Sequence, residues 1–281
     1  MERFTIQMMC PDRAPSPSWG SVLHGMLMET LPSPWPEKMH EEGPRPLSQW
    51  VEVKSPTRFI WHIRVLDDDL GEALEKALTP GKILSCVHLN AQMTIESVEI
   101  ERLTPAAYMK PFFLSEEPCP GMYITFCTPT THKSQRQYAI FPSVELIAKN
   151  LAIRFCAMAP DFALADPEAL NQVIAHTRIS RYRLESMRYS LEGAWLVGYT
   201  GRVELRFEGP DPLKRLAGIL FSFASWSGVG IKTALGMGGC EVMPLKRKQG
   251  NGFSAQSEKE CEPKDSFLSG SGKQNRFAQE E

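Results

Sequence analysis

The chain has 281 residues, 42% of them apolar, and its 31 Lys and Arg nearly balance 33 Asp and Glu, for a net charge of −2. This is enough material for one large or two small globular domains. The balanced charge excludes a protein that coats nucleic acid through bulk positive charge, so any nucleic-acid site must be local. The longest dominantly apolar run, 216–226, is too short to span a bilayer, which takes about 20 residues.

The start of the chain has no continuous hydrophobic stretch, and the seven cysteines are scattered, with no two spaced as a zinc knuckle requires. These features favour a reducing compartment without a disulfide framework. We therefore expect a cytoplasmic protein with no membrane association. No His-Glu-x-x-His motif or other metal-ligand spacing occurs, so we expect no metal and no other cofactor.

Residues 1–114 alternate between strand and helix patterns. Strand patterns cover 3–9, 48–54 and 59–66, and the long alternating stretch 83–103 indicates a strand or a hairpin. Apolar residues recur at helical spacing in 19–31 and 70–78, and the aspartates 67–69 suit the cap of the second helix. The resulting order, β-α-β-β-α-β, is that of a ferredoxin-like unit.

The same order recurs in the second half of the chain. Strands are predicted at 122–128, 179–191, 195–207 and 240–245, and helices at 142–154 and 212–226. We therefore predict an α+β protein of two tandem ferredoxin-like domains, 1–118 and 119–246, divided in the proline-rich stretch 115–120. The remainder, 247–281, is polar and rich in Gly and Ser, which predicts a disordered tail.

A glycine-rich segment, 228–239, precedes the last predicted strand and has the sequence GVGIKTALGMGG. It follows a helix and lacks the glycine spacing of a Walker A loop, so it fits neither a P-loop nor a Rossmann fingerprint. Dense glycines let backbone N–H groups approach a ligand closely, and Lys232 adds charge, which together suit a phosphate backbone. A tight helix-to-strand connection explains the pattern equally well.

Two consecutive ferredoxin-like units, with two late Gly-apolar-Gly triplets separated by five residues, resemble the RAMP proteins of CRISPR systems. Within them the closest match is the Cas6 endoribonuclease family. Three further stretches fit that family: LHG at 23–25, MHE at 39–41 followed by RPLS at 45–48, and TPT at 128–130 leading through Lys133 and Arg136 to Phe141. The resemblance covers residues 1 to about 246, and the histidine stretch is what separates a nuclease from non-catalytic relatives.

The resemblance implies a metal-independent endoribonuclease that processes precursor crRNA at its CRISPR repeats. The 2′-hydroxyl would attack the scissile phosphate and leave a 2′,3′-cyclic phosphate or 3′-phosphate and a 5′-hydroxyl. Such a site needs a base, an acid and a cation. The match places His40 at the catalytic position as general acid or base and His24 as a second catalytic or positioning residue. Arg45, with Lys38 in second place, would supply the cation.

The histidines also have bland explanations. Judged from the residues alone, His24 in an apolar helix is about twice as often a hydrogen-bonded core histidine as a catalytic one. His40 lies among charged residues and could be a surface side chain, but the family match favours the catalytic role for His40 and makes the two roles of His24 about equal. His132 is left open between an RNA contact and a surface role, while His62, His88 and His176 belong to no motif and are assigned to structure.

Between 178 and 206 the chain carries six arginines against three acids, with Tyr182, Tyr189 and Tyr199 among them. Arginine and tyrosine on a hairpin can pair phosphates and stack on bases. The rival interpretation is a solvated hairpin with the tyrosines packed beneath. The residues expected to contact RNA are Gly228, Gly230, Lys232, Gly236, Gly238, Lys133, Arg136, Arg181, Arg183 and Arg202.

Two other functions compete with the nuclease. The first is a non-catalytic RAMP subunit that binds crRNA in an interference complex, and the second is a ferredoxin-like protein that binds a small molecule. Besides repeat RNA, the candidate partners are interference-complex subunits and a second copy of this chain, because exposed strand edges of this fold can pair.

Overall fold

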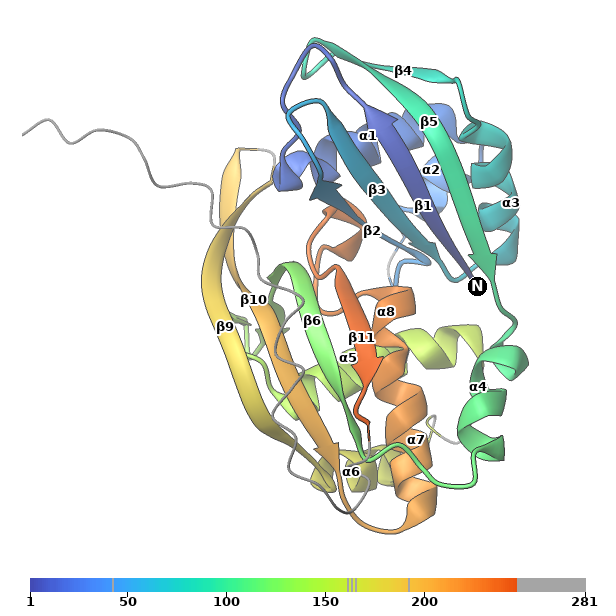
Figure 1. Cartoon of the computed structure of the whole chain (residues 1–281), viewed down its shortest axis with the longest axis vertical. Helices are drawn as coiled ribbons and strands as arrows, with labels where there is room; N and C mark the ends of the chain where they lie inside the picture. Colours follow the sequence, from blue (N-terminus) through green and yellow to red (C-terminus); the bar gives the residue numbers. More distant parts are fainter. Residues whose placement is uncertain (42, 161, 163, 165, 192, 247–281) are drawn as a thin grey trace, which may run out of the picture. The chain divides into compact units, whose positions relative to one another are not determined.

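Two antiparallel sheets organise the computed structural model (Figure 1). The first has the order β2 (Leu47–Val53), β3 (Arg58–Val65), β1 (Glu2–Met9), β5 (Ala91–Arg102), β4 (Ile83–Cys86). The second has the order β11 (Cys240–Pro244), β6 (Gly121–Thr130), β10 (Ala194–Phe207), β9 (Thr177–Leu191). The strands can be numbered 1 to 4 within each half, as β1, β2, β3 and β5 in the first and β6, β9, β10 and β11 in the second, with the added edge strand β4 left out. Each sheet then has the order 4-1-3-2. This is the predicted pair of ferredoxin-like units.

The structure describes residues 1–41, 43–160, 162, 164, 166–191 and 193–246. The part from Met1 to Lys246 forms one compact unit. The predicted tail, 247–281, lies outside the described residues, and the division of the chain between 118 and 119 stays a prediction. Among the described residues no helix is long and apolar enough to cross a membrane.

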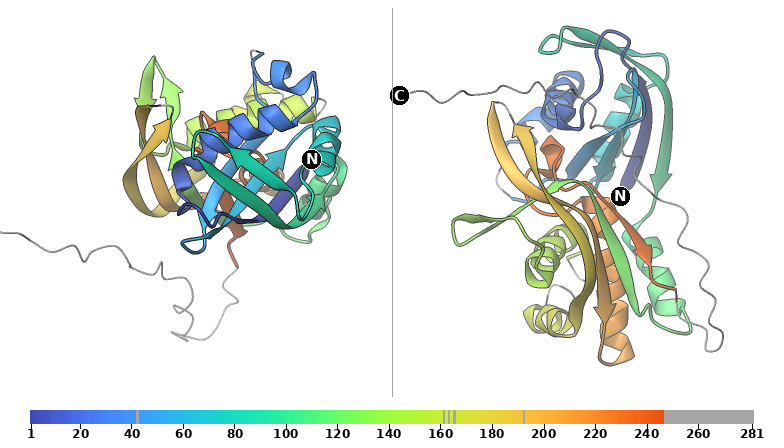
Figure 2. Two further views of the ribbon diagram at one scale, coloured as in Figure 1. Left: turned by 90° about the horizontal axis from the view of Figure 1, so that it is seen from above. Right: turned by 60° about the vertical axis from the view of Figure 1, so that its left-hand side comes forward.

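Helices cover one face of each sheet (Figures 1 and 2). In the first half these are α1 (Gly20–Thr30), preceded by the 3-10 turn η1 (Pro17–Trp19), with the short α2 (Trp35–Lys38) and α3 (Asp68–Ala77). In the second half they are α4 (Pro105–Leu114), α5 (Val144–Met158), α6 (Pro167–Ala175), α7 (Asp211–Ser222) and α8 (Ala224–Ser227). The 3-10 turn η3 (Thr233–Leu235) lies inside the glycine-rich segment, and β7 (His132–Ser134) and β8 (Gln137–Ala139) form a separate small hairpin.

Strict alternation along the strands creates the two cores. In β1 every second residue is buried, so Phe4, Ile6 and Met8 face Leu23 of α1 and Leu70 of α3 in one cluster. The second cluster joins the inner face of β6 and β10 to apolar residues of α5 and α7, among them Ile124, Val203, Ile147, Leu151 and Leu220. Each half therefore buries its own sheet face, as a duplicated unit requires.

The predicted elements are confirmed to within a few residues, with two refinements and four omissions. The stretch 83–103 is a hairpin, β4–β5, and the helix expected over 212–226 is divided at Phe223 into α7 and α8. The aspartate cap is confirmed, because the Asp67 carboxylate accepts from the Leu70 N–H at 3.0 Å. The sequence patterns missed α2, α4, α6 and the β7–β8 hairpin.

The close packing of Gly236 in the glycine-rich segment predicts that a larger residue there destabilises the protein. Gly236 has φ +99°, and a Cβ on it would lie 2.1 Å from the Tyr189 hydroxyl and 2.8 Å from the Gly20 Cα. We expect Gly236→Ala to lower the free energy of unfolding by about 2–4 kcal/mol, through left-handed backbone strain and overpacking. Urea denaturation followed by circular dichroism measures this loss.

Gly25 is the matched control for that substitution. It lies within α1, and a Cβ there would meet nothing within 4 Å. Gly25→Ala should therefore raise stability by about 0.5–1 kcal/mol, since glycine is the poorer helix former. Equal effects of the two alanines would contradict this account of the loop.

Candidate active site and nucleic-acid interface

The glycine-rich segment packs between the two halves of the molecule, and most of its residues are buried. It packs on β2 and on the start of α1, and its four triplet glycines Gly228, Gly230, Gly236 and Gly238 are all buried. Each has positive φ, as does Lys232 at +56°. Lys232, by contrast, is exposed.

Backbone N–H groups of the four triplet glycines are already occupied by protein acceptors. Gly228 donates to Ala224 O at 2.9 Å, Gly230 to Asn150 Oδ1 at 2.8 Å and Gly238 to Pro129 O at 3.1 Å. Gly236 donates to Thr233 O at 3.4 Å. The N–H groups of these glycines are therefore turned to protein, and a phosphate at this loop would meet the Lys232 side chain. The predicted glycine contacts with RNA stay predictions, with this constraint on them.

Two buried polar side chains hold the segment from opposite sides. Gln49 of β2, fully buried, donates to Ala234 O at 2.6 Å and to Gly20 O at 3.2 Å. Arg154 of α5 donates to Ser227 O at 2.7 Å, to Gly230 O at 3.2 Å and to Thr233 Oγ1 at 2.9 Å. Burial lowers the pKa of Arg154 to about 10, which still leaves the guanidinium charged at neutral pH.

His24 lies on α1, four residues after Gly20, which contacts this segment. Gly20, at the start of α1, abuts Gly236 and the Leu235 carbonyl. Residues four apart share one face of a helix, about 6 Å apart along its axis. His24 therefore extends from the face of α1 that packs on the glycine-rich segment, and it is partly buried there.

His40 and Arg45 share the connection between α2 and β2. His40 is exposed, and its N–H donates to Glu37 O at 2.9 Å, which closes a turn after α2. The Arg45 guanidinium donates to the Glu41 carbonyl, so the structure brings its charge to the residue next to His40. Lys38 differs from Arg45, because its ammonium lies over the Trp35 ring, 4.6 Å from the centroid.

Exposed cations occur on β7–β8, β9 and the glycine-rich segment. Within the described part of the chain no acid pairs with Lys133, Arg136, Arg181, Arg183, Arg188 or Lys232. Of these, Arg188 was not among the residues predicted to bind RNA. Arg202 also lacks an ion pair there, but its guanidinium lies over the Tyr123 ring at 4.6 Å.

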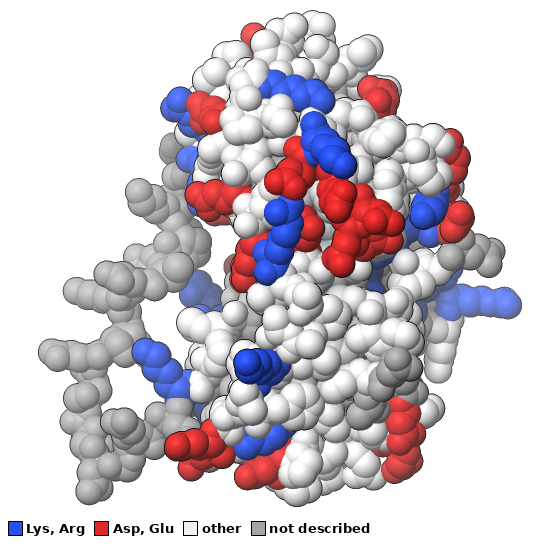
Figure 3. Space-filling view, turned by 90° about the vertical axis from the view of Figure 1, so that its right-hand side faces the viewer, with Lys and Arg blue, Asp and Glu red and all other residues white. Residues whose placement is uncertain are grey.

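Cations on another side of the molecule are paired. Figure 3 shows acidic side chains gathered with Lys and Arg side chains on the upper part of the side that carries α3 and α4. Arg102 pairs there with Glu2 and Glu75, and Arg3 pairs with Glu101. This side therefore offers little net positive charge to a polyanion, which leaves the unpaired cations as the better RNA surface.

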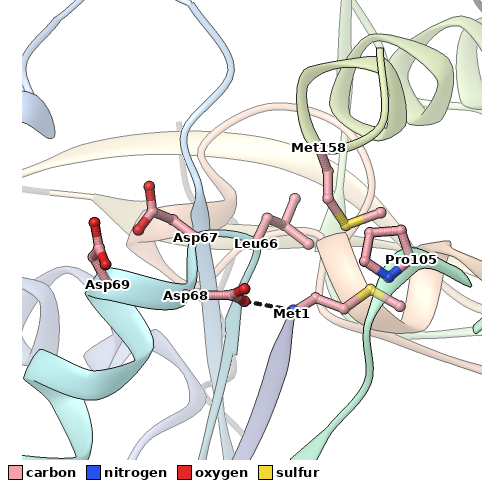
Figure 4. A pocket seen from close by; sticks show the side chains of 7 residues that line it. All are labelled: Met1, Leu66, Asp67, Asp68, Asp69, Pro105 and Met158. Atoms are coloured by element: carbon pink, nitrogen blue, oxygen red, sulfur yellow. Dashed lines mark hydrogen bonds and ion pairs between the residues drawn. The ribbon is translucent and has the colours of Figure 1, made fainter. Parts of the chain in front are cut away.

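Three aspartates that begin α3 line a small pocket beside Met1, Leu66, Pro105 and Met158. Figure 4 shows Asp68 directed at the Met1 amine, to which it is bonded at 3.0 Å, while Asp67 and Asp69 point elsewhere. Capping and ion pairing thus account for Asp67 and Asp68.

The tyrosines of the β9–β10 hairpin divide between the two predicted roles. Tyr189 is buried and donates to Leu235 O at 3.0 Å, and Tyr199 is buried beside His132 Nε2 at 3.1 Å. Tyr182 is 63% exposed. Both roles considered for His132 are wrong, because the side chain is buried, and burial lowers its pKa to about 4 so that it is neutral at pH 7.

Comparison with known proteins identifies the family. The family profile described as "CRISPR-associated endoribonuclease Cas6" matches residues 124–240. A CRISPR-associated endoribonuclease Cas6 of Streptococcus thermophilus is 30% identical over 223 residues, which cover 79% of this chain and 90% of the relative. Its namesake from Mycobacterium tuberculosis is 27% identical over 250 residues, covering 87% of this chain and 78% of the relative.

Solved structures agree on the fold. A Thermus thermophilus Cas6 in a product complex superposes with a TM-score of 0.70 at 19% identity, covering 86% of this chain and 100% of the other. A histidine-to-alanine mutant of another Cas6 gives 0.65 at 18% identity, with coverage of 86% and 100%. At such identities these matches establish the α+β architecture of two ferredoxin-like units, while the sequence relatives establish descent. The chain belongs to the family of CRISPR-associated Cas6 endoribonucleases.

Proposed function

We propose that this protein cuts precursor crRNA at its CRISPR repeats and so produces guide RNAs. The observation that carries the proposal is membership of a family named for endoribonuclease activity, supported over nearly the whole length of a relative. The group of unpaired cations on β7–β8, β9 and Lys232 supports it independently, since RNA binding needs positive charge that is not already neutralised. The solved Cas6 product complex gives a precedent for RNA on this fold.

The proposed reaction is an attack by the 2′-hydroxyl on the adjacent phosphorus. The 2′-oxygen loses its proton to a base and bonds to phosphorus, the bond to the 5′-oxygen breaks, and that oxygen takes a proton from an acid. The products are a 2′,3′-cyclic phosphate, or a 3′-phosphate after hydrolysis, and a 5′-hydroxyl. Proton transfer and charge stabilisation suffice for this step, so we propose that it is metal-independent.

His40 is the proposed general acid or base. Its exposed position leaves the imidazole accessible to RNA, and an imidazole can both accept and donate a proton, so it can serve as base or acid. Arg45, anchored on the neighbouring Glu41 carbonyl, would stabilise the charge on the phosphate. His24, on the face of α1 beside the Lys232 segment, is proposed as the second catalytic or positioning residue.

The nuclease and the guide-binding subunit predict different results for His40→Ala. We expect the repeat RNA of the source genome to be cut at one position, with the rate reduced about 100- to 10,000-fold by His40→Ala while affinity is retained. Cleavage should persist in EDTA and stop when the nucleotide at the cut carries a 2′-deoxy group. A gel assay with end-labelled RNA measures all three.

His88→Ala is the matched control for His40→Ala, because His88 is an exposed histidine in the turn between β4 and β5. It should leave the cleavage rate unchanged. Tight binding by the wild type without any cut would transfer the proposal to the non-catalytic subunit, and a rate lost equally in both variants would remove the catalytic role of His40.

The cations of the β7–β8 hairpin predict how the affinity for RNA depends on salt concentration. Lys133→Ala and Arg136→Ala should each weaken RNA binding and reduce the slope of log affinity against log salt by about 0.7, as expected for one lost phosphate contact to a single strand. Fluorescence anisotropy at several salt concentrations measures the slope. Lys76→Ala, which removes an exposed lysine paired with Glu72 on α3, is the control expected to leave the slope intact.

Interference-complex subunits and a second copy of this chain are further proposed partners. The edge strands β9 and β11 of the second sheet and β4 of the first are where another strand could pair. The scattered cysteines also support a proposed cytoplasmic location.

A further inference from the structure

An aromatic patch lies exposed where β8 leads toward α5, beside strand β9. It consists of Tyr138, Ile140, Phe141 and Tyr182, which are 53%, 45%, 56% and 63% exposed. The Phe141 and Tyr182 rings meet edge to face, with centroids 5.6 Å apart and an interplanar angle of 89°. Isolated exposed apolar residues are common on protein surfaces, but a group of this kind indicates a binding surface.

Positive charge borders the patch on the side of the β7–β8 hairpin. Lys133 is the direct cross-strand partner of Tyr138, and the exposed Arg136 lies in the turn between these two strands. No acid occurs in the sequence from 118 to 144. The first acid beyond it, Glu145, already pairs with Lys149.

Aromatic faces bordered by unpaired cations suit one class of ligand. A single-stranded nucleic acid offers flat bases that stack on aromatic rings and phosphates that pair with Lys and Arg. An apolar peptide would match the rings but would leave the cations without counter-charges. The observations therefore favour an unpaired RNA segment over a protein partner.

Hydrogen bonds connect the β7–β8 hairpin, which carries part of the patch, to the glycine-rich segment. Ile231, next to Lys232, donates its N–H to Thr131 O at 3.0 Å, and the Thr131 hydroxyl donates to Ala139 O at 3.0 Å. The hairpin that carries Tyr138 is thus fixed to the loop that presents Lys232. Figure 2 shows this hairpin, in yellow-green, projecting beside the gold strands β9 and β10.

We propose that the aromatic patch is a stacking platform for unpaired bases of the repeat RNA, with Phe141 and Tyr182 contacting the bases and Lys133 and Arg136 the flanking phosphates. This rests on the proposed function and specifies how the RNA is held away from the cut. Because every base has a π face, the platform would contribute affinity with little sequence preference.

Replacing an aromatic ring of the patch with the apolar side chain of leucine tests the platform. Tyr182→Leu and Phe141→Leu should each weaken binding of the repeat RNA about 5- to 100-fold with an unchanged salt slope, because a stacked base but no phosphate contact is lost. Tyr182→Phe and Phe141→Tyr keep the ring and should bind like the wild type. Phe113→Leu, at a 49% exposed phenylalanine on α4, is the control for ring removal elsewhere.

A fluorescent base gives a second readout on the same proteins. Repeat RNAs carrying one 2-aminopurine, moved through each unpaired position, should reveal a position whose emission falls on binding to wild type and to Tyr182→Phe. That quenching should be lost with Tyr182→Leu. Thermal melts of each variant establish folding, which exposed positions should not disturb.

The outcomes separate failure of the platform from failure of the proposed function. Wild-type affinity and quenching in both leucine variants, with RNA still cut, would overturn the platform alone. If the leucine variants have an altered sedimentation coefficient but an unchanged RNA affinity, the patch is a protein contact, and the stacking platform is also overturned. A wild type that neither binds nor cuts repeat RNA would remove the proposed function and the platform together.

Discussion

The close contact between the glycine-rich segment and α1 is the constraint on which the arrangement of the two halves depends. A Cβ on Gly20 would lie 2.5 Å from the Gly236 Cα, and a Cβ on Gly236 would lie 2.1 Å from the Tyr189 hydroxyl. Backbone meets backbone here, so only glycine fits on either side. Because the contact leaves no space for side chains, it determines how closely β2 and α1 of the first half approach the loop of the second.

Such close backbone packing leaves buried carbonyls that need donors. Gln49 and Arg154 supply them, and Arg64 acts similarly at α8, where it donates to Ser225 O at 3.1 Å and pairs with Glu241 at 3.1 Å. A buried guanidinium is costly unless its N–H groups find acceptors, and each of these arginines finds several. The interface between the halves is thus a hydrogen-bonded polar layer between two apolar cores, which favours one fixed geometry over sliding.

Periodicity was enough to predict the two ferredoxin-like units because alternate burial is encoded residue by residue. It missed α2, which has four residues, and the β7–β8 turn, where Gln135 and Arg136 adopt positive φ without the usual Gly or Asn. The Asp166-Pro167 pair that caps α6 was a usable start signal, since Asp166 accepts from the Glu168 N–H at 3.0 Å.

Site residues were harder to predict than elements, because exposure depends on partners remote in sequence. The glycines looked available for a ligand, yet their N–H acceptors come from Pro129, Asn150 and other distant positions. Likewise Tyr182 and Tyr189 occupy one strand pattern, and pairing with β10 places them on opposite faces, Tyr182 opposite Val203 and Tyr189 opposite Leu196. A period-two pattern shows that the faces alternate but not which one is covered.

The two roles of the glycine-rich segment follow from one geometry. Its interior glycines are consumed in joining the halves, and the left-handed turn at Lys232 places the exposed cation of the segment on the surface beside the β7–β8 hairpin. Rigid backbone contacts on the inner side restrict the motion of that cation relative to α1, where His24 lies. The RNA contact proposed for Lys232 would gain positional accuracy from these backbone contacts, because a catalytic phosphate site tolerates only displacements well below 1 Å.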